Sequence, residues 1–161
     1  MHVRTAGIGD FSAIEKLLLN AYEPVLQRLP EADAMSLASS FPSAVSRYAE
    51  RGTWLVAERD SELHGCVAFF EPGSTPHLLF QGNVAHIQLL GVARAHIRTG
   101  VGRALMKYCF VLAKAARAEE LLLQTSEHMP EARRLYESLG FVVKEELHHV
   151  WGAPTFLYAK A

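Results

Sequence analysis

The chain has 161 residues, of which 50% are hydrophobic, so it can bury the core of one domain without help from a metal or a disulfide. Its formal charge of −1 at pH 7 argues against nucleic acid or an anionic membrane as the main partner. The two cysteines, Cys66 and Cys109, lie in apolar stretches without C-x-x-C spacing, which indicates buried thiols in a reducing compartment. There is no signal-peptide pattern and no apolar run of about 18 residues. We therefore expect one cytoplasmic domain over residues 1–161, with a small molecule or a protein as its partner.

The first half of the chain predicts a strand, two helices and a hairpin. In order, the expected elements are a strand over 2–6 that suits a sheet edge, a helix over 7–22, a helix over 31–50, and antiparallel strands over 53–58 and 63–71. Phe11, Ile14, Leu18 and Tyr22 fall on one stripe of the first helix. Pro42 is expected to break the second helix, because proline lacks the N–H that the helix interior requires.

The second half begins with a loop over 72–83, which is either a functional loop or a surface insertion. The elements expected after it are an apolar strand over 84–92, an amphipathic helix over 100–117, a buried strand over 119–126, a helix over 130–140, and closing strands over 141–151 and 155–161. The whole order is β-α-α-β-β-β-α-β-α-β-β. Strand, helix and strand between residues 84 and 125 form a candidate parallel βαβ unit among antiparallel hairpins, so the sequence predicts an α/β fold on a mixed sheet.

Two glycines, Gly100 and Gly102, lie where the apolar strand leads into the amphipathic helix. The dinucleotide fingerprint fails because Leu105 replaces its third glycine, and the phosphate loop of nucleotide hydrolases fails because arginine follows Gly102. Free N–H groups from Arg98 to Arg103 at a helix N-terminus would still favour an anion, and glycine lets the backbone approach it closely. The alternative is a tight turn that only connects the strand to the helix.

Downstream, "EARRLYESLGF" places Tyr136 on one helical face with Ala132, Leu135 and Leu139. Core packing explains the three aliphatic residues. Tyr136 is either one more core aromatic or a phenol with a function, because a buried hydroxyl needs a partner.

With these two segments the sequence resembles the GCN5-related N-acetyltransferase (GNAT) family, whose members transfer an acetyl group from acetyl-CoA to an amine. "LGVARAHIRTGVGRALM" looks like the family's pyrophosphate motif, Q/R-x-x-G-x-G/A, and "MPEARRLYESLGF" looks like its N-x-x-A-x-x-x-Y…GF segment. The resemblance follows the element order of the whole chain and is most specific between Gln88 and Phe141. It implies the family's acyl-CoA acyltransferase fold, in which the fourth and fifth strands are parallel and splay apart to open a cleft.

The resemblance implies a set of coenzyme-binding residues. The main chain of Arg98, Thr99, Gly100, Val101, Gly102 and Arg103 would hold the pyrophosphate, and that of Leu90, Gly91 and Val92 would pair with the pantetheine arm like an added strand. Met129, near the thiol end, and Ala132 would also contact the coenzyme, and Tyr136 would give a proton to the departing thiolate. Three positions depart from the family: Ile97 replaces Gln or Arg, Met129 replaces Asn, and Gln88 replaces a frequent Glu.

The acceptor amine must lose a proton before it attacks, and Gln88 cannot act as the base. His86 shares a strand face with Gln88 and is the nearest titratable candidate, with Gln88 positioning a water or the substrate. Alternatively, His86 is a strand histidine without a catalytic role, and solvent is the base. A bulge in this strand would break the shared face.

The other histidines show no metal-ligand spacing, because His148 and His149 are adjacent and the rest are dispersed along the sequence. We therefore predict no metal. In the family, the acceptor pocket is shaped by the first two helices and by loops beside the sheet; Tyr22, Glu23, His77, Phe80 and Trp151 occupy such places here.

The function expected from the resemblance is direct acetyl transfer from acetyl-CoA to a primary amine of a small molecule or peptide. The alternative is a non-catalytic acyl-CoA-binding or regulatory module, favoured by the joint departures at Ile97, Gln88 and Met129. Closing strands often form dimer contacts in the family, so a homodimer is compatible with the resemblance. The sequence does not identify the amine.

Overall fold

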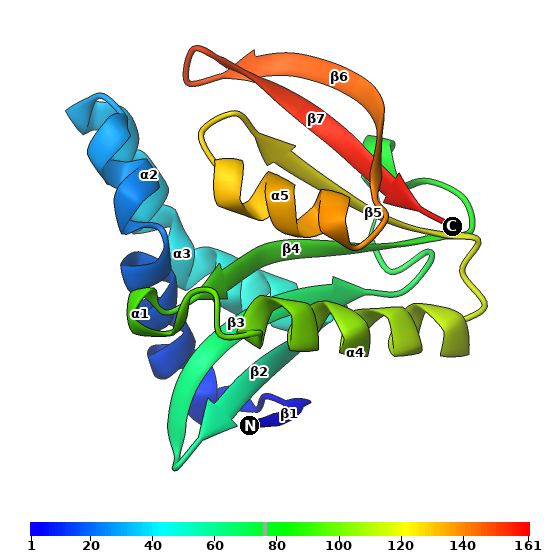
Figure 1. The fold of residues 1–161 in the computed structure, drawn as a ribbon, viewed down its shortest axis with the longest axis horizontal. Coiled ribbons are helices and arrows are strands. Elements are labelled where there is room, and N and C mark those ends of the chain that lie inside the picture. Colours follow the sequence, from blue (N-terminus) through cyan, green and yellow to red (C-terminus); the bar gives the residue numbers. More distant parts are fainter. Residues whose placement is uncertain (76) are drawn as a thin grey trace.

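The computed structural model describes residues 1–75 and 77–161, so Pro76, within the predicted loop 72–83, lies outside the described residues. The elements, in order, are β1 (His2–Thr5), α1 (Phe11–Ala21), α2 (Glu23–Arg28), α3 (Glu31–Arg51), β2 (Thr53–Arg59), β3 (Glu62–Phe70), β4 (Val84–Val92), α4 (Val101–Ala115), β5 (Glu120–Ser126), α5 (Pro130–Ser138), β6 (Val142–Val150) and β7 (Ala153–Lys160) (Figure 1). Short 3-10 helices cover Ile8–Asp10, Leu78–Phe80 and Arg94–His96.

The strands form one seven-stranded sheet in the order β1-β2-β3-β4-β5-β7-β6. Neighbouring strands run antiparallel except for β4 and β5, which run parallel and are linked through α4. The predicted mixed α/β sheet is confirmed, and β1 lies at its edge as expected.

The strands β4 and β5 diverge after a short parallel ladder. Their pairing covers Val84, Ala85 and His86 opposite Glu120–Leu122, whereas β4 continues to Val92 and β5 to Ser126. The main chain of the far half of β4 is therefore free of β5. This is the predicted splay.

A bulge interrupts β4 just where it leaves β5. Leu89 has a φ of 51°, and the pairing with β3 shifts register between Gln88, opposite Ala68, and Gly91, opposite Cys66. Consequently Ile87 and Leu90 pack on the same face, although they are three residues apart, and Leu89 packs on the other face. Because the bulge follows Gln88, the ladder stays regular from His86 to Gln88 and the face that these two share is retained.

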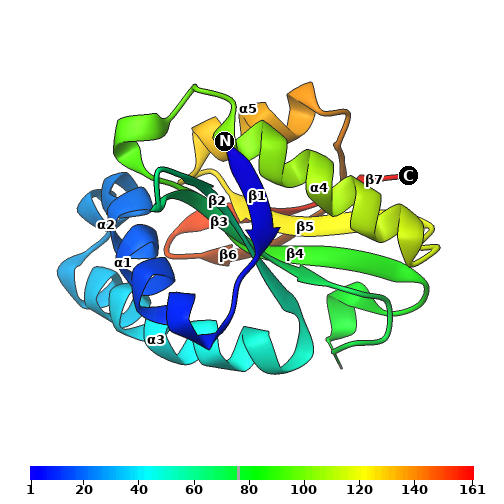
Figure 2. The ribbon, with the colours of Figure 1, turned by 90° about the horizontal axis from the view of Figure 1, so that it is seen from below.

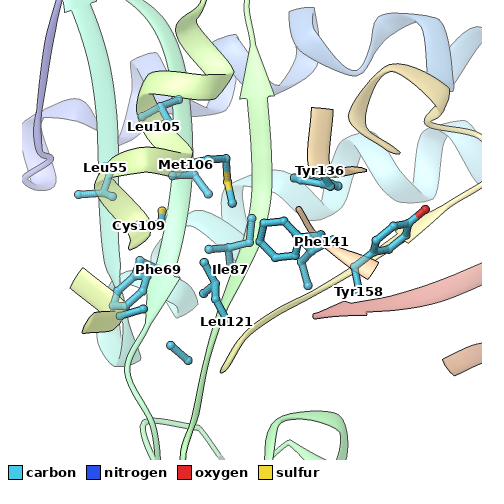
Figure 3. Close-up of a cluster of buried hydrophobic side chains, with 14 of the residues drawn as sticks. Leu55, Phe69, Ile87, Leu105, Met106, Cys109, Leu121, Tyr136, Phe141 and Tyr158 are labelled. Carbon is cyan, nitrogen blue, oxygen red and sulfur yellow. The ribbon is translucent and has the colours of Figure 1, made fainter. Parts of the chain in front are cut away.

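Helices cover both faces of the sheet. Figure 2 shows α1, α2 and α3 on one side and α4 with α5 on the other. Beneath α4, the apolar residues Leu105, Met106 and Cys109 pack on Leu55 and Ile87 of the sheet (Figure 3). The opposite core joins α1 and α3 to Trp54 and neighbouring residues of β2 and β3. Both helical layers therefore hold β4 from the two sides at the splay.

One helical expectation is wrong, and one segment for which no element was expected forms a helix. The segment after Tyr22 forms a separate short helix, α2, which begins next to Pro24, a residue that helix N-termini accept. α3 runs without a break through Pro42, because the buried Phe41 and Val45 fix the helix to the sheet on both sides of the proline. Tertiary packing outweighs the lost backbone hydrogen bond. Within the described ranges, the helices are all too short or too polar to cross a membrane.

Candidate active site

The divergence of β4 and β5 opens into a cleft of about 720 Å³. One wall is the end of α1 with α2, which contributes Tyr22, Val25 and Arg28. The floor is the end of β4, with Leu90, Gly91 and Val92, and the opposite wall is α5 with the residues just before it, including Met129 and Ala132. The loop before α4 closes one end with Arg98, Gly100, Val101, Gly102 and Arg103. The structure thus brings together ten of the twelve residues predicted to bind the coenzyme.

The loop before α4 presents backbone to the cleft. Gly100 has a φ of 91°, and a Cβ on it would meet nothing within 4 Å, so the positive φ and not crowding requires glycine here. Arg98 also has a positive φ, 60°, which is uncommon for a residue with a side chain. This conformation leaves the first N–H groups of α4 directed out of the helix, where an anion can accept them.

Close contacts with β3 and α5 hold the loop before α4 and the start of that helix in place. A Cβ on Gly65 of β3 would stand 2.6 Å from Val101 Cγ1, and a Cβ on Gly102 would stand 2.9 Å from Leu135 Cδ2. Arg103 Nη2 donates to Ser138 Oγ over 2.9 Å. The start of α4 is therefore pressed against the sheet on one side and α5 on the other.

The end of β4 also packs closely, against α1. A Cβ on Gly91 would lie 3.3 Å from both Ala21 Cβ and Leu18 Cδ2, so α1 approaches the strand closely. The hydroxyl of Tyr22 donates to the carbonyl oxygen of Leu90 over 3.4 Å. Tyr22, predicted near the acceptor, does line the cleft.

Tyr136 lies behind the cleft wall, next to Leu135, which lines the cleft, and is only 5% exposed. Its ring packs against Phe141 and Tyr158, with centroids 5.8 and 6.3 Å away. Burial raises the pKa of Tyr136 above its ordinary value, so the phenol is protonated at neutral pH. Burial also raises the pKa of Tyr22, and the nearby phenol of Tyr136 raises it further. The structure supports a protonated phenol at this position; its role as a proton donor stays a prediction.

His86 is enclosed by aromatic rings. It is 3% exposed and stacks between Phe70 and Phe80, with centroids 4.5 and 3.9 Å away and planes within 6° of parallel. Desolvation, with a smaller effect of His77, lowers the pKa of His86 to about 4. The imidazole is therefore neutral at pH 7.

Several predicted site residues lie outside the lining of this cleft, as far as residues 1–75 and 77–161 define it. They are His86, Gln88 and Tyr136 among the catalytic candidates, Thr99 in the loop, and Glu23, His77, Phe80 and Trp151 among the acceptor candidates. Thr99 faces a smaller cavity behind the loop, and its hydroxyl donates to the His96 carbonyl over 2.5 Å. Trp151 approaches indirectly, because its carbonyl lies 3.1 Å from Nε2 of His128, a cleft residue.

The cleft also contains residues that were not predicted. They include Arg28, Arg94, His128, Glu131, Arg134 and Ser138. On α5, Glu131, Arg134, Leu135 and Ser138 follow one helical face, so the periodicity of that helix could have revealed them. Five arginines line the cleft against one carboxylate, that of Glu131, among the described residues. This charge balance suits an anionic ligand.

The histidines need a correction as well. Dispersed in sequence, His64 and His96 come together in space, with stacked rings 3.5 Å apart and Glu62 beside them. The pairing of β3 with β4 continues into a bond from Ala93 N to the His64 carbonyl, which places the 3-10 helix of His96 beside β3. Sequence spacing alone could not show this register.

Comparison with known proteins identifies the fold. PaiA N-acetyltransferase from Thermoplasma acidophilum, solved in complex with coenzyme A, superposes with a TM-score of 0.78 at 17% identity, over 99% of this chain and 97% of that one. The ribosomal-protein-alanine N-acetyltransferase from Brucella melitensis gives 0.72 at 20% identity over 99% of both chains. The structure of yncA from Salmonella typhimurium with its cofactor acetyl-CoA gives 0.72 at 18% identity, over 99% and 92%. At these identities the likeness shows the fold.

The sequence itself matches the model of the Acetyltransferase (GNAT) family over residues 12–141. The chain therefore belongs to the GNAT acetyltransferases, as the two sequence segments predicted. A comparison with curated proteins gives no match. Members of this family need no metal for the transfer itself.

Proposed function

We propose that this protein is an acetyl-CoA-dependent N-acetyltransferase that transfers the acetyl group directly to a primary amine of a small molecule or peptide. One observation carries the proposal. The cleft joins the loop Arg98–Arg103, whose N–H groups can bind an anion, to the end of β4, where the strand is no longer paired with β5. A ligand with a pyrophosphate and an amide-containing arm fits this combination.

The residues present fit the coenzyme. The N–H groups at the start of α4 would bind the pyrophosphate, and Arg98 and Arg103 would supply positive charge beside it. The open space around Gly100 leaves room for a phosphate against the backbone. Beyond the bulge, Leu90 and Val92 would form main-chain hydrogen bonds with the pantetheine amides, as a strand does at a sheet edge. These contacts are mainly with the backbone, so they do not require the Gln or Arg that Ile97 replaces.

Each chemical step falls to a group of this chain or to solvent. Acetyl-CoA supplies the activated thioester. An amide N–H near Leu90 would polarise the thioester carbonyl as negative charge develops on its oxygen. Tyr136, protonated at neutral pH, would donate its proton to the leaving thiolate sulfur, which requires the thiol end to reach past Leu135. We assign removal of the amine proton to solvent, because His86 is enclosed between Phe70 and Phe80.

The names of two solved relatives support nitrogen as the acceptor atom, and the cleft has space for an acceptor. The solved relatives from Thermoplasma acidophilum and Brucella melitensis are both named N-acetyltransferases. The cleft extends beyond β4 toward α2, where Tyr22, Val25 and Arg28 leave room for an acceptor next to the thiol end.

Turnover tests the proposal directly. Acetyl-CoA binding is measured by calorimetry, and release of coenzyme thiol is followed against amino acids, polyamines, aminoglycosides and N-terminal peptides. Tyr136→Phe is expected to lower kcat at least tenfold with acetyl-CoA affinity little changed, as expected for loss of a general acid. Tyr108→Phe, on the exposed side of α4, is the matched control. An unchanged rate in Tyr136→Phe would remove this residue from the mechanism.

A non-catalytic acyl-CoA-binding module remains the second candidate. The departures at Ile97, Gln88 and Met129 favour it, together with the enclosed position of His86. It predicts tight acetyl-CoA binding without thiol release from any amine of the panel. Thiol release with a single amine contradicts it.

A further inference from the structure

We propose that Glu62, His64 and His96 form a binding site for one divalent transition metal ion of the zinc type. The site lies behind the loop before α4 (Arg98–Arg103, here called the coenzyme loop), on the side away from the cleft. Glu62 and His64 lie at the start of β3, and His96 ends the 3-10 helix before the loop. One candidate ligand atom from each residue lies within 4.8 Å of those of the other two. No step of the acetyl transfer uses these residues.

The donor set determines the class of metal. Two imidazoles and one carboxylate are the ligands that zinc sites use, with about 2.0–2.2 Å from metal to ligand. Cobalt and nickel accept the same donors, whereas magnesium and calcium prefer oxygen ligands alone. A fourth position is left for water.

The site is partly built before the metal arrives. His64 is 8% exposed, and its ring lies against that of His96, with an angle of 9° between the planes, so the two imidazoles are already neighbours. His96 Nε2 lies 4.0 Å from Glu62 Oε1. Ligand atoms of one tetrahedral zinc ion lie about 3.3 Å apart. The side chain of Glu62 is 72% exposed, so it is free to swing inward. The rings must also turn out of parallel for their lone pairs to converge, and His96 is the more exposed of the two.

The cavity beside the three residues is small and open to solvent. It has a volume of about 350 Å³, and Arg59, Asp60 and Thr99 also line it. Asp60 adds a second carboxylate nearby and offsets the charge of Arg59. The volume of the cavity is large enough for a hydrated ion.

The site is connected to the coenzyme loop. Val101 lines both this cavity and the cleft, and the Thr99 hydroxyl donates to the His96 carbonyl. A metal that fixes His96 would restrict the loop before the ligand arrives, so less conformational entropy is lost when acetyl-CoA binds. We expect acetyl-CoA affinity to rise at least twofold with bound metal and, by linkage, zinc affinity to rise by the same factor with bound acetyl-CoA. This coupling rests on the proposed function, whereas the metal site does not.

Calorimetric titration of the full, tag-free chain with ZnCl₂ after removal of metals tests the site. We expect saturable binding of one zinc ion per chain and no binding of MgCl₂. Both His96→Gln and Glu62→Gln should weaken zinc binding at least tenfold, while His149→Gln, an exposed histidine on β6, should not. Circular dichroism confirms that each variant is folded. The absence of saturable binding, or equal binding in His96→Gln, would overturn the site.

A second titration, with acetyl-CoA in the presence and absence of saturating zinc, tests the coupling. Acetyl-CoA is the suitable probe because its sulfur is a thioester and not a zinc-binding thiol. Tighter binding in the wild type, with no zinc effect in His96→Gln, is the expected result. Equal or weaker acetyl-CoA binding with zinc would overturn the coupling. If acetyl-CoA fails to bind under any condition, the proposed function fails, and the zinc titration still decides the site.

Discussion

The hydroxyl of Tyr22 donates a hydrogen bond to the main-chain carbonyl of Leu90, directly after the bulge in β4. This bond joins the wall of the cleft formed by α1 and α2 to the strand end on which the proposed thioester contacts depend. Tyr22 is held in turn by the ring of Phe41, in an edge-to-face contact with centroids 5.5 Å apart. The orientation of the Leu90 peptide is therefore set partly by a side chain from the opposite face of the sheet.

Tyr22→Phe tests this relationship. The ring keeps its packing, so the free energy of unfolding should fall by less than about 1 kcal/mol for the loss of one long hydrogen bond. The Leu90 peptide loses its anchor, so kcat/KM should fall severalfold in the thiol-release assay. Tyr48→Phe, a half-buried tyrosine on α3, serves as the matched control. Unchanged kinetics in Tyr22→Phe would show that the bond is dispensable.

Gly100→Val should abolish most acetyl-CoA binding. Valine disfavours the positive φ of residue 100, and its side chain would fill the open space in which the phosphate is proposed to lie. We expect at least a tenfold weaker affinity by calorimetry. Gly82→Val introduces the same strain at a φ of 86° at the other end of β4 and should leave binding intact. Full-strength binding by Gly100→Val would show that the loop does not hold the coenzyme.

Gly65→Ala should destabilise the protein and loosen the same loop. The new Cβ would lie 2.6 Å from Val101 Cγ1 and 3.0 Å from Leu105 Cδ1, so these side chains or the start of α4 must shift. Overpacking of this kind costs about 1–3 kcal/mol. Thermal unfolding and acetyl-CoA titration should both show the effect. Gly9→Ala, where a Cβ meets nothing within 4 Å, is the control. A melting temperature equal to that of the wild type would contradict the close packing.

His86 should make stability depend on pH. Burial lowers its pKa from 6.5 to about 4, so between these values the unfolded chain binds a proton that the folded chain excludes. Its contribution therefore destabilises the fold progressively as the pH falls from about 6.5 to about 4, and it vanishes above that range.

His86→Phe keeps an aromatic ring between Phe70 and Phe80 and removes this titration. The fall in melting temperature from about pH 7.5 to about pH 4.5 should become smaller in the variant. His149→Gln should retain the wild-type slope. His86→Phe should also keep the wild-type pH–rate profile if solvent is the base. Loss of the acid limb of the profile in His86→Phe would instead identify His86 as the group that removes the amine proton.

The sequence predicted the fold well where local pattern and packing agree. The turn between β2 and β3 follows from a polar pair, Asp60 and Ser61, which adopt the positive φ values of a tight hairpin. Pro42 illustrates the opposite case, because local propensity favours a break and the burial of Phe41 and Val45 overrides it. A local sequence pattern does not show how much the burial of these two residues stabilises the helix.

The part of the site that is formed by the backbone could be predicted from the sequence. The positions of the side chains around it could be predicted less well. The two glycines mark the loop because their conformation is encoded in the residue type. His86 is shut off from the cleft because Phe80, in the 3-10 helix just before β4, and Phe70 of β3 stack on its two faces, and residue spacing does not reveal this stacking. His64 and His96 are brought together by the register of two strands, which sequence spacing does not reveal.

The bulge at Leu89 has a consequence for how this protein can vary. A ligand that is read by carbonyl and N–H groups places little demand on the identity of the residues that carry them, so Leu90 and Val92 should accept many apolar replacements in the course of evolution. The path of the chain is what natural selection must preserve. Harmful substitutions should therefore concentrate at Gly100, where the shape of the backbone is inherited, and at Gly91, where α1 leaves little room for a side chain.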